Sequence, residues 1–311
     1  MSQITETQLK KIFAQRGLEE PRKLEKVAVG FTNKVFSVDD KYILKVCADV
    51  SNEQNFRVEA VLYGFFKGKL PVPKLVIYDD SKEAIPSHYM IYKKIAGDNL
   101  YNVWHKLSIE ERRRVTKQLC SLLKIINQTP VSDLPDGAIL KPLPSWRDHI
   151  VGEIDKSLKV VSEAGTLSTD EVASIRAYVQ AHQDVLDEAD VALVYWDAHF
   201  DNILVRGDEI VGLLDFERTE LASTDFALDI VKRMVEQPKK YMSEYAEQFA
   251  KDEDYKDLLS WYKEFYPELF NFSGMDTRLN LYAIAHNLKD LEGWPDVVGL
   301  KDGIMEIVGK N

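Results

Sequence analysis

Residues 195–216 read YWDAHFDNILVRGDEIVGLLDF, and this stretch decides how the rest of the chain is interpreted. Two short apolar runs, 203–205 and 210–214, flank a polar turn signal centred on Gly207. Apolar runs joined by a glycine-containing turn predict a β-hairpin. We therefore expect Asp215, which follows the second run, to return beside the loop that precedes the first run.

Three oxygen-bearing side chains are predicted to meet where this hairpin closes: Asp197, Asn202 and Asp215. Carboxylate and amide oxygens suit a hard cation such as Mg²⁺, and a carboxylate that does not bind the metal can take a proton from an attacking hydroxyl. Asp197 and Asn202 also have the D-x-x-x-x-N spacing of the kinase catalytic loop. Phosphoryl transfer requires this combination of positioning and charge neutralisation. The alternative interpretation is a polar loop held by side-chain caps and Asx turns.

Composition limits the classes of function that fit the chain. It has 311 residues, a formal net charge of −11 and 45% hydrophobic residues, which is enough to bury a core. No apolar stretch approaches the roughly 20 residues of a membrane span, and the N-terminus lacks an apolar signal core. A general nucleic-acid binder needs a basic surface. Cys47 and Cys120 lack a metal-ligand spacing and read as reduced thiols. We expect a cytoplasmic protein without nucleic-acid or membrane partners.

Short β-like runs dominate the first third of the sequence. One run covers 24–29, and a hairpin of 34–38 and 42–46 is predicted around the turn residues Asp39 and Asp40. A helix over 52–67 and a strand over 89–97 are expected to follow.

Helical periodicity dominates the remainder of the chain. Ser108 with Glu111, and Ser168 with Glu171, have the spacing of capping boxes before apolar-periodic segments. The β-like stretch that contains the opening hairpin interrupts this helical part.

Residues 195–230, which continue the opening stretch through DFERTELASTDFALDI, resemble the aminoglycoside phosphotransferase family. Members of that family read roughly His-Gly-Asp, four residues, Asn, a hairpin and Ile-Asp-Trp, and the resemblance covers about residues 24–232. It implies an α+β, bilobal, protein-kinase-like fold with a small β-rich N-terminal lobe and a larger, mostly helical C-terminal lobe. It also implies that Asp197 is the catalytic base and that Asn202 and Asp215 bind magnesium.

The change from β-like runs to helical periodicity predicts three parts of the chain, and the resemblance implies their roles. They are a nucleotide-binding lobe at 1–91, a hinge at 92–97, and a helical lobe at 98–311 that carries the catalytic loop and the acceptor site. In the same comparison, Asp229 is expected to support the catalytic loop, and Asp225 is expected to cap a helix.

Lys45 resembles the kinase lysine that grips the α- and β-phosphates, and Glu59 in the following helix is its expected ion-pair partner. A solvated edge lysine is the alternative when Lys45 is taken alone. Gly30, Thr32 and Asn33 stand where a phosphate-binding loop is expected, and backbone N–H groups there would face phosphate. A plain hairpin turn fits those three residues equally well.

Backbone groups around Lys93 and Ile95 are expected to hydrogen-bond the edge of the nucleotide base. The chain also departs from the family pattern. Tyr195 and Trp196 replace the His-Gly pair before the catalytic aspartate, and Phe216 replaces the tryptophan of Asp-Trp-Glu. A large side chain in place of glycine is the greater change, and it leaves open whether activity is reduced.

The acceptor pocket is expected on the helical lobe, facing Asp197. Glu217, Glu220, Asp290 and Glu292 are candidate wall residues, because acidic side chains there would attract polyamine substrates. For Asp290 and Glu292 the alternative is a solvated charge near a helix end.

The prediction is a small-molecule kinase that uses Mg²⁺ and ATP or GTP to phosphorylate a hydroxyl of an aminoglycoside-like or other small polar acceptor. The family includes antibiotic-resistance enzymes. The alternatives are a non-catalytic nucleotide-binding pseudokinase and a metabolite kinase of the choline, fructosamine or homoserine type. A protein kinase fits less well, because no Ala-Pro-Glu follows Asp215. A metal-dependent phosphatase would not need Lys45 or a hinge.

Overall fold

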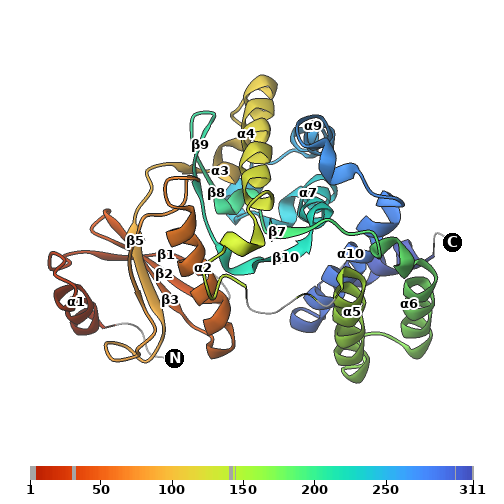
Figure 1. Cartoon of the computed structure of the whole chain (residues 1–311), viewed down its shortest axis with the longest axis horizontal. Helices are drawn as coiled ribbons and strands as arrows, with labels where there is room; N and C mark the ends of the chain where they lie inside the picture. Colours follow the sequence, from red (N-terminus) through yellow and green to blue (C-terminus); the bar gives the residue numbers. More distant parts are fainter. Residues whose placement is uncertain (1–4, 30–32, 140–142, 144, 298, 310–311) are drawn as a thin grey trace.

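The computed structural model describes residues 5–29, 33–139, 143, 145–297 and 299–309, and it confirms the bilobal α+β fold (Figure 1). The N-terminal part contains α1 (Glu6–Gln15), β1 (Leu24–Val29), β2 (Asn33–Val38), β3 (Tyr42–Cys47), α2 (Glu53–Phe66), β4 (Leu75–Asp79) and β5 (Tyr89–Lys93). The C-terminal part contains β6 (Asp98–Asn99), α3 (Leu100–Trp104), α4 (Ile109–Asn127), α5 (Trp146–Glu163), α6 (Thr169–His182), β7 (Val191–Tyr195), β8 (Ile203–Arg206), β9 (Glu209–Leu213), β10 (Thr219–Ser223), α7 (Ala227–Glu236), α8 (Glu244–Glu247), α9 (Leu258–Phe265), α10 (Met275–Gly293) and α11 (Leu300–Val308).

The N-terminal sheet is antiparallel, with the strand order β1-β2-β3-β5-β4. The predicted β2–β3 hairpin is confirmed. Its turn residues, Asp39 and Asp40, have positive φ angles of 53° and 56°, which aspartate tolerates better than most residues.

The two faces of this sheet have different partners. Leu44 and Val46 of β3 pack in the same core as Phe13 of α1, whereas Ile43 and Cys47 belong to the core that includes α2. Successive side chains of a strand point to opposite faces. This alternation directs Lys45 toward α2 and the C-terminal lobe, on the sheet face away from α1 (Figure 1).

The C-terminal lobe surrounds two small sheets with helices. Strands β7 and β10 pair with each other, while β8 lies between β6 and β9. In Figure 1 these strands lie between the N-terminal sheet and the helices α5, α6 and α10. Both predicted capping boxes are confirmed, Ser108 with Glu111 at α4 and Ser168 with Glu171 at α6.

The connection between the lobes packs tightly on the β8–β9 hairpin. Strand β5 ends at Lys93, earlier than the expected end at 97, and β6 then pairs with β8. A Cβ atom added to Gly97 would lie 2.8 Å from a methyl carbon of Val211 and 3.0 Å from the carbonyl oxygen of Val205. A glycine therefore allows the connection to approach the hairpin.

Asp225 is not the N-cap of α7, which is Phe226. Its buried carboxylate instead accepts hydrogen bonds from the guanidinium of Arg278 at 2.7 and 2.8 Å and from the hydroxyl of Tyr282 at 2.8 Å. The cap prediction is wrong because the tertiary fold buries this residue against α10.

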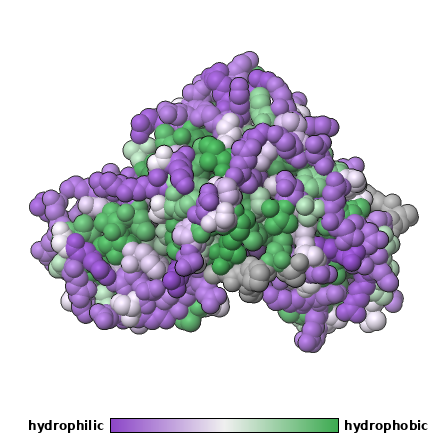
Figure 2. Space-filling model, viewed as in Figure 1, coloured by the Kyte–Doolittle hydropathy of each residue, from purple (hydrophilic) through white to green (hydrophobic). Residues whose placement is uncertain are grey.

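The face in Figure 2 is mostly polar, with apolar side chains visible over the N-terminal lobe and the middle of the molecule. Among the described residues, no helix is both long enough and apolar enough to span a membrane.

Candidate active site

The β8–β9 hairpin closes as the opening stretch predicts. Ile203 pairs with Leu213, and the amide of Leu214 donates a 2.8 Å hydrogen bond to the carbonyl of Asn202. Asp215 is the next residue after Leu214, so the hairpin returns it to the end of the loop that contains Asp197.

The side chain of Asn202 has a fixed orientation. Its Nδ2 atom donates a 2.9 Å hydrogen bond to the backbone carbonyl of Asp197 and lies 3.2 Å from Nε2 of His199. Because the amide nitrogen is occupied in this way, the amide oxygen is left as a potential ligand for a cation.

The side chain of Asp197 is partly enclosed, with 21% of its surface exposed. Its Oδ1 atom lies 3.5 Å from Nε2 of His199. Removal from water raises the pKa of Asp197, and the charge of Asp215 acts in the same direction, while His199, Arg218 and His286 oppose the shift. A carboxylate with a raised pKa is a better proton acceptor, which suits a general base.

Lys45 lies at the centre of a buried charge cluster. Its Nζ atom is 2.6 Å from Glu59, 2.8 Å from Glu217 and 3.3 Å from Asp215. Burial lowers the pKa of Lys45, but the three carboxylates outweigh this effect and hold the pKa well above its ordinary value. The lysine is therefore charged, whereas burial raises the pKa of Glu59 to about 8.

Two residues that the sequence did not single out complete this cluster. Tyr63 donates a 2.5 Å hydrogen bond to Glu59 and accepts a 2.9 Å bond from the amide of Asp215. Asn52 donates a 2.6 Å bond to Glu217. Tyr63 lies one helical turn after Glu59, a spacing that places both side chains on the same helix face. No sequence signal points to Asn52.

Asp215 has a left-handed backbone conformation, with φ 56° and ψ 66°. The hydrogen bond that its amide donates to the hydroxyl of Tyr63 supports this uncommon conformation. Asp215 is also the most exposed carboxylate of the cluster, because 42% of its side chain is accessible, against 1% for Glu59 and 6% for Glu217.

The cluster fits a divalent cation. One oxygen each from Glu59, Asp215 and Glu217 lie within 4.8 Å of one another, with a single lysine to balance them. Carboxylate oxygens are ligands that Mg²⁺ prefers, and the amide oxygen of Asn202, at the start of the β8–β9 hairpin, is a further ligand of this type.

Tyr195 and Trp196 fill the positions of the family's His-Gly pair. The hydroxyl of Tyr195 donates a 2.6 Å hydrogen bond to the carbonyl of Leu214. Trp196 packs against Phe226 and against the ring of His286, with ring centres 5.4 and 5.8 Å apart. The bulky pair is therefore accommodated by packing beside the loop at 197–202.

Asp229 contacts His286, which packs against Trp196 at the start of this loop. Its buried carboxylate accepts hydrogen bonds from Arg233 at 3.0 Å and His286 at 2.9 Å. Burial raises the pKa of Asp229, but Arg233 and His286 reverse the effect, so the net shift is downward. His286 in turn packs on Trp196, which links Asp229 to the loop.

The four acidic residues expected at the acceptor wall have other partners. Glu217 belongs to the Lys45 cluster and also accepts a 2.5 Å hydrogen bond from Asn33. Asp290 pairs with Lys240 of the 3-10 turn Pro238–Tyr241, and Glu292 pairs with Lys289, each at 2.8 Å. Glu220 lies in β10 opposite Val194. Three of the four are thus ion-paired within the protein, and an acceptor wall formed by these residues stays a prediction.

The remaining predicted residues concern the nucleotide. Gly30 and Thr32 lie outside the described residues, whereas Asn33 begins β2. The amide of Lys93 donates a 3.0 Å hydrogen bond to the carbonyl of Lys74. Among the described residues, the backbone of Ile95 has no such hydrogen-bond partner, so its N–H and C=O groups are available.

The comparisons with known proteins agree with this geometry. The sequence profile of the APH family, described as the phosphotransferase enzyme family, matches residues 23–256. The chain belongs to this phosphotransferase family. No protein among the curated sequences matches it.

Solved structures share the fold of this phosphotransferase at low sequence identity. The streptomycin–ATP complex of APH(2″)-IIa is 18% identical, with a TM-score of 0.70, and the match covers 100% of this chain and 98% of that chain. ADP-bound APH(2″)-Ib is 17% identical, with a TM-score of 0.71 and coverage of 98% and 97%. A thermostable mutant of APH(4)-Ia is 18% identical, with a TM-score of 0.67 and coverage of 98% and 96%.

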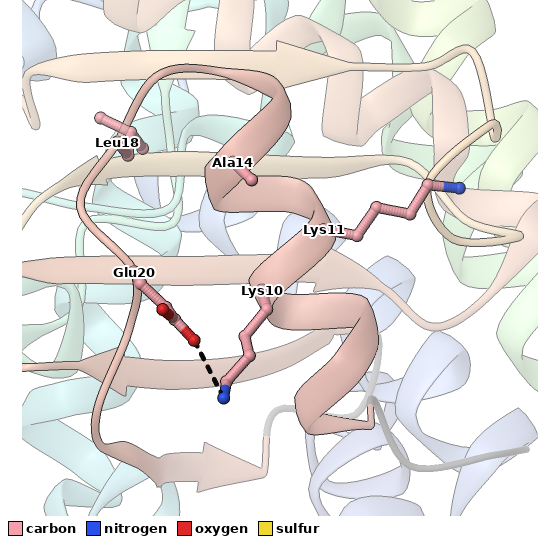
Figure 3. A pocket seen from close by; sticks show the side chains of 5 residues that line it. All are labelled: Lys10, Lys11, Ala14, Leu18 and Glu20. Atoms are coloured by element: carbon pink, nitrogen blue, oxygen red, sulfur yellow. Dashed lines mark ion pairs between the residues drawn. The ribbon is translucent and has the colours of Figure 1, made fainter.

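A surface hollow beside α1 is separate from this site. Lys10, Lys11, Ala14, Leu18 and Glu20 line it, and Lys10 forms a 3.0 Å ion pair with Glu20 across it (Figure 3). Helix α1 packs on the sheet face opposite to the one that carries Lys45, so the hollow has no access to the charge cluster.

Proposed function

We propose that this phosphotransferase is a small-molecule kinase that transfers the γ-phosphoryl group of ATP or GTP to a hydroxyl of a small polar acceptor. The observation that carries the proposal is the β8–β9 hairpin, which returns Asp215 to the loop of Asp197 and Asn202 while Lys45 reaches Asp215 from the N-terminal lobe at 3.3 Å. Solved structures of similar fold contain ATP, ADP or GDP, which supports a nucleotide donor.

The proposed roles follow from the charges of the side chains. Lys45, oriented by Glu59, aligns the phosphates of the donor, and Asn202 and Asp215 hold Mg²⁺. When bound, the ion would supply charge neutralisation for the phosphate groups. Asp197 orients the acceptor hydroxyl and receives its proton. The acceptor oxygen bonds to the γ-phosphorus as the bond to the β–γ bridging oxygen breaks, and the nucleoside diphosphate leaves with that electron pair.

The nucleotide base is proposed to lie along the connection at 92–97, between the lobes 1–91 and 98–311. The free backbone groups of Ile95 support this placement, with Lys93 beside them. Gly30, Thr32 and Asn33 are proposed to line the phosphates. A cytoplasmic location agrees with the use of a nucleoside triphosphate.

The test is a panel of aminoglycosides, macrolides, choline and amino sugars assayed with Mg²⁺ and with each nucleotide. We expect Asp197→Ala to lower turnover by at least ~10²-fold, the lower range of general-base effects, with unchanged nucleotide affinity. Asp215→Ala is expected to weaken binding of the metal–nucleotide complex instead. Asp208→Ala, at the exposed hairpin turn, is the matched control and should behave as the wild type.

The alternative outcome is a nucleotide-binding protein without transfer activity. Binding of the metal–nucleotide complex with no transfer, and no effect of Asp197→Ala on the remaining nucleotide hydrolysis, would contradict the proposal. Phosphorylation of a generic protein substrate in preference to all small molecules would instead indicate a protein kinase.

A further inference from the structure

Three of the four acidic residues predicted to line the acceptor site near Asp197 are already paired with cations of the protein. A polyamine acceptor needs carboxylates that are free to pair with its ammonium groups. Glu217, Asp290 and Glu292 are instead engaged by cations of the protein itself, at 2.8 Å in each case. Glu220 lies in the β7–β10 ladder opposite Val194.

One cation beside the catalytic loop has no ion-pair partner in the part of the chain that the structure describes. Arg218 follows the charge cluster in the sequence, and its side chain is exposed. The guanidinium carbon lies over the indole of Trp196, 5.8 Å from the ring centre. Trp196 immediately precedes Asp197. The positive charge of Arg218 also lowers the pKa of Asp197.

A position over an aromatic ring suits a guanidinium that binds an anion. The ring attracts the positive charge, while the N–H groups of the guanidinium stay available to a ligand. Those N–H groups match the two oxygens of a carboxylate or a phosphate in a bidentate arrangement. The family's glycine at the position of Trp196 would offer no such platform.

We infer that the acceptor of this enzyme carries a carboxylate or phosphate group near its reactive hydroxyl, and that Arg218, held on Trp196, is the residue that selects it. The inference rests on the proposed function, because it concerns the acceptor of the same phosphoryl transfer. It places polycationic compounds among the poor substrates, because Arg218 repels them and the neighbouring acids are already paired.

A matched set of acceptors tests this selectivity. Each compound carries a hydroxyl beside a different group: a carboxylate in glycerate, a phosphate in glycerol 3-phosphate, a neutral group in glycerol and a cation in choline. Hydroxy acids and sugar phosphates of increasing size extend the two anionic arms of the set. Nucleoside diphosphate release is measured with Mg²⁺ and each nucleotide. We expect the highest kcat/KM in one of the anionic arms, and the better arm identifies the anion.

Variants of Arg218 provide the second measurement. Arg218→Gln is expected to lower kcat/KM for the best anionic acceptor by about 10- to 100-fold, the range for a lost charge-assisted hydrogen bond, with little change for neutral acceptors. Arg218→Glu should reverse the order, so that choline exceeds the anionic acceptors. Arg176→Ala, an exposed arginine on α6, is the matched control and should leave all values unchanged. Unchanged Tm values would show that the variants fold.

Three outcomes overturn the inference. In the first, none of the anionic acceptors is phosphorylated. In the second, choline or an aminoglycoside has a higher kcat/KM than every anionic acceptor. In the third, the Arg218→Gln variant loses activity equally on neutral and anionic acceptors. In the second case the proposed kinase function stands. Failure to bind the metal–nucleotide complex would contradict the proposed function itself.

Discussion

The hydroxyl of Tyr195 donates a 2.6 Å hydrogen bond to the carbonyl of Leu214, which joins the end of β7 to the segment that carries Asp215. The ring of Tyr195 also stacks on Phe216, with ring centres 4.5 Å apart and an interplanar angle of 8°. Both rings are fully buried. Tyr195 therefore fixes the segment around Asp215 from both sides, through the residue before it and the residue after it.

Tyr195→Phe is expected to lower the free energy of unfolding by about 1–3 kcal/mol, because the carbonyl of Leu214 loses its donor while the ring stacking remains. Asp215 should also become less well positioned. Denaturant unfolding measures the first effect, and the Kd of the magnesium–nucleotide complex measures the second. A variant with wild-type nucleotide affinity would show that Tyr195 has only a structural role.

The activity should depend on pH through Asp197. A general base acts only when it is ionised, and burial raises the pKa of this carboxyl. The kcat/KM should therefore fall as the pH decreases, with a midpoint above the value of about 3.9 that is ordinary for aspartate. Removal of the positive charge in Arg218→Gln should move the midpoint to higher pH. An acidic limb at or below the ordinary value would contradict the assignment of Asp197.

Gly97→Ala is expected to destabilise the protein by about 1–3 kcal/mol, the usual cost of overpacking. The new methyl group would meet Val211 and the backbone of Val205 at 2.8 and 3.0 Å. Gly152→Ala, within α5, is the control, because no atom lies within 4 Å of its added Cβ. It should stabilise the protein by about 0.5–1 kcal/mol through helix propensity. Equal Tm values for the two variants would show that the connection relaxes.

Asp225→Asn should be strongly destabilising, by about 3–5 kcal/mol, because it leaves the buried guanidinium of Arg278 without its counter-ion. Arg147→Ala is the matched control at the surface, where the arginine pairs with Asp184 and Asp187 at 3.1 and 3.0 Å. Exposed pairs contribute about 0–1 kcal/mol. Thermal unfolding compares the two, and a small effect at Asp225 would mean that the network around Tyr282 replaces the lost charge.

Local signals in the sequence were sufficient for the hairpin and for the helix starts. The glycine turn between two apolar runs predicted the pairing of Ile203 with Leu213, because turn chemistry and strand alternation act over short distances. The capping boxes at Ser108 and Ser168 are likewise local, since each involves residues three positions apart.

These local signals do not predict contacts between segments that are far apart in the sequence. The role of Asp225 depends on Arg278, and that of Glu217 on Asn33 and Asn52, which lie far away in the sequence. A carboxylate has the same local pattern whether it meets solvent, a substrate or a buried cation. Only the packing of one segment on another supplies the partner.

The sequence by itself determined the local elements through periodicity and turn chemistry, the order of chemical groups along residues 195–216 through their spacing, and the kinase-like arrangement through the resemblance to a known family. The tertiary structure decided which carboxylates are paired and which cation is not. Burial and partner distance set the charge that a ligand meets, and these quantities exist only after the chain has folded. The ion pairs of Glu217, Asp290 and Glu292, and the contact of the exposed guanidinium of Arg218 with Trp196, are of this kind.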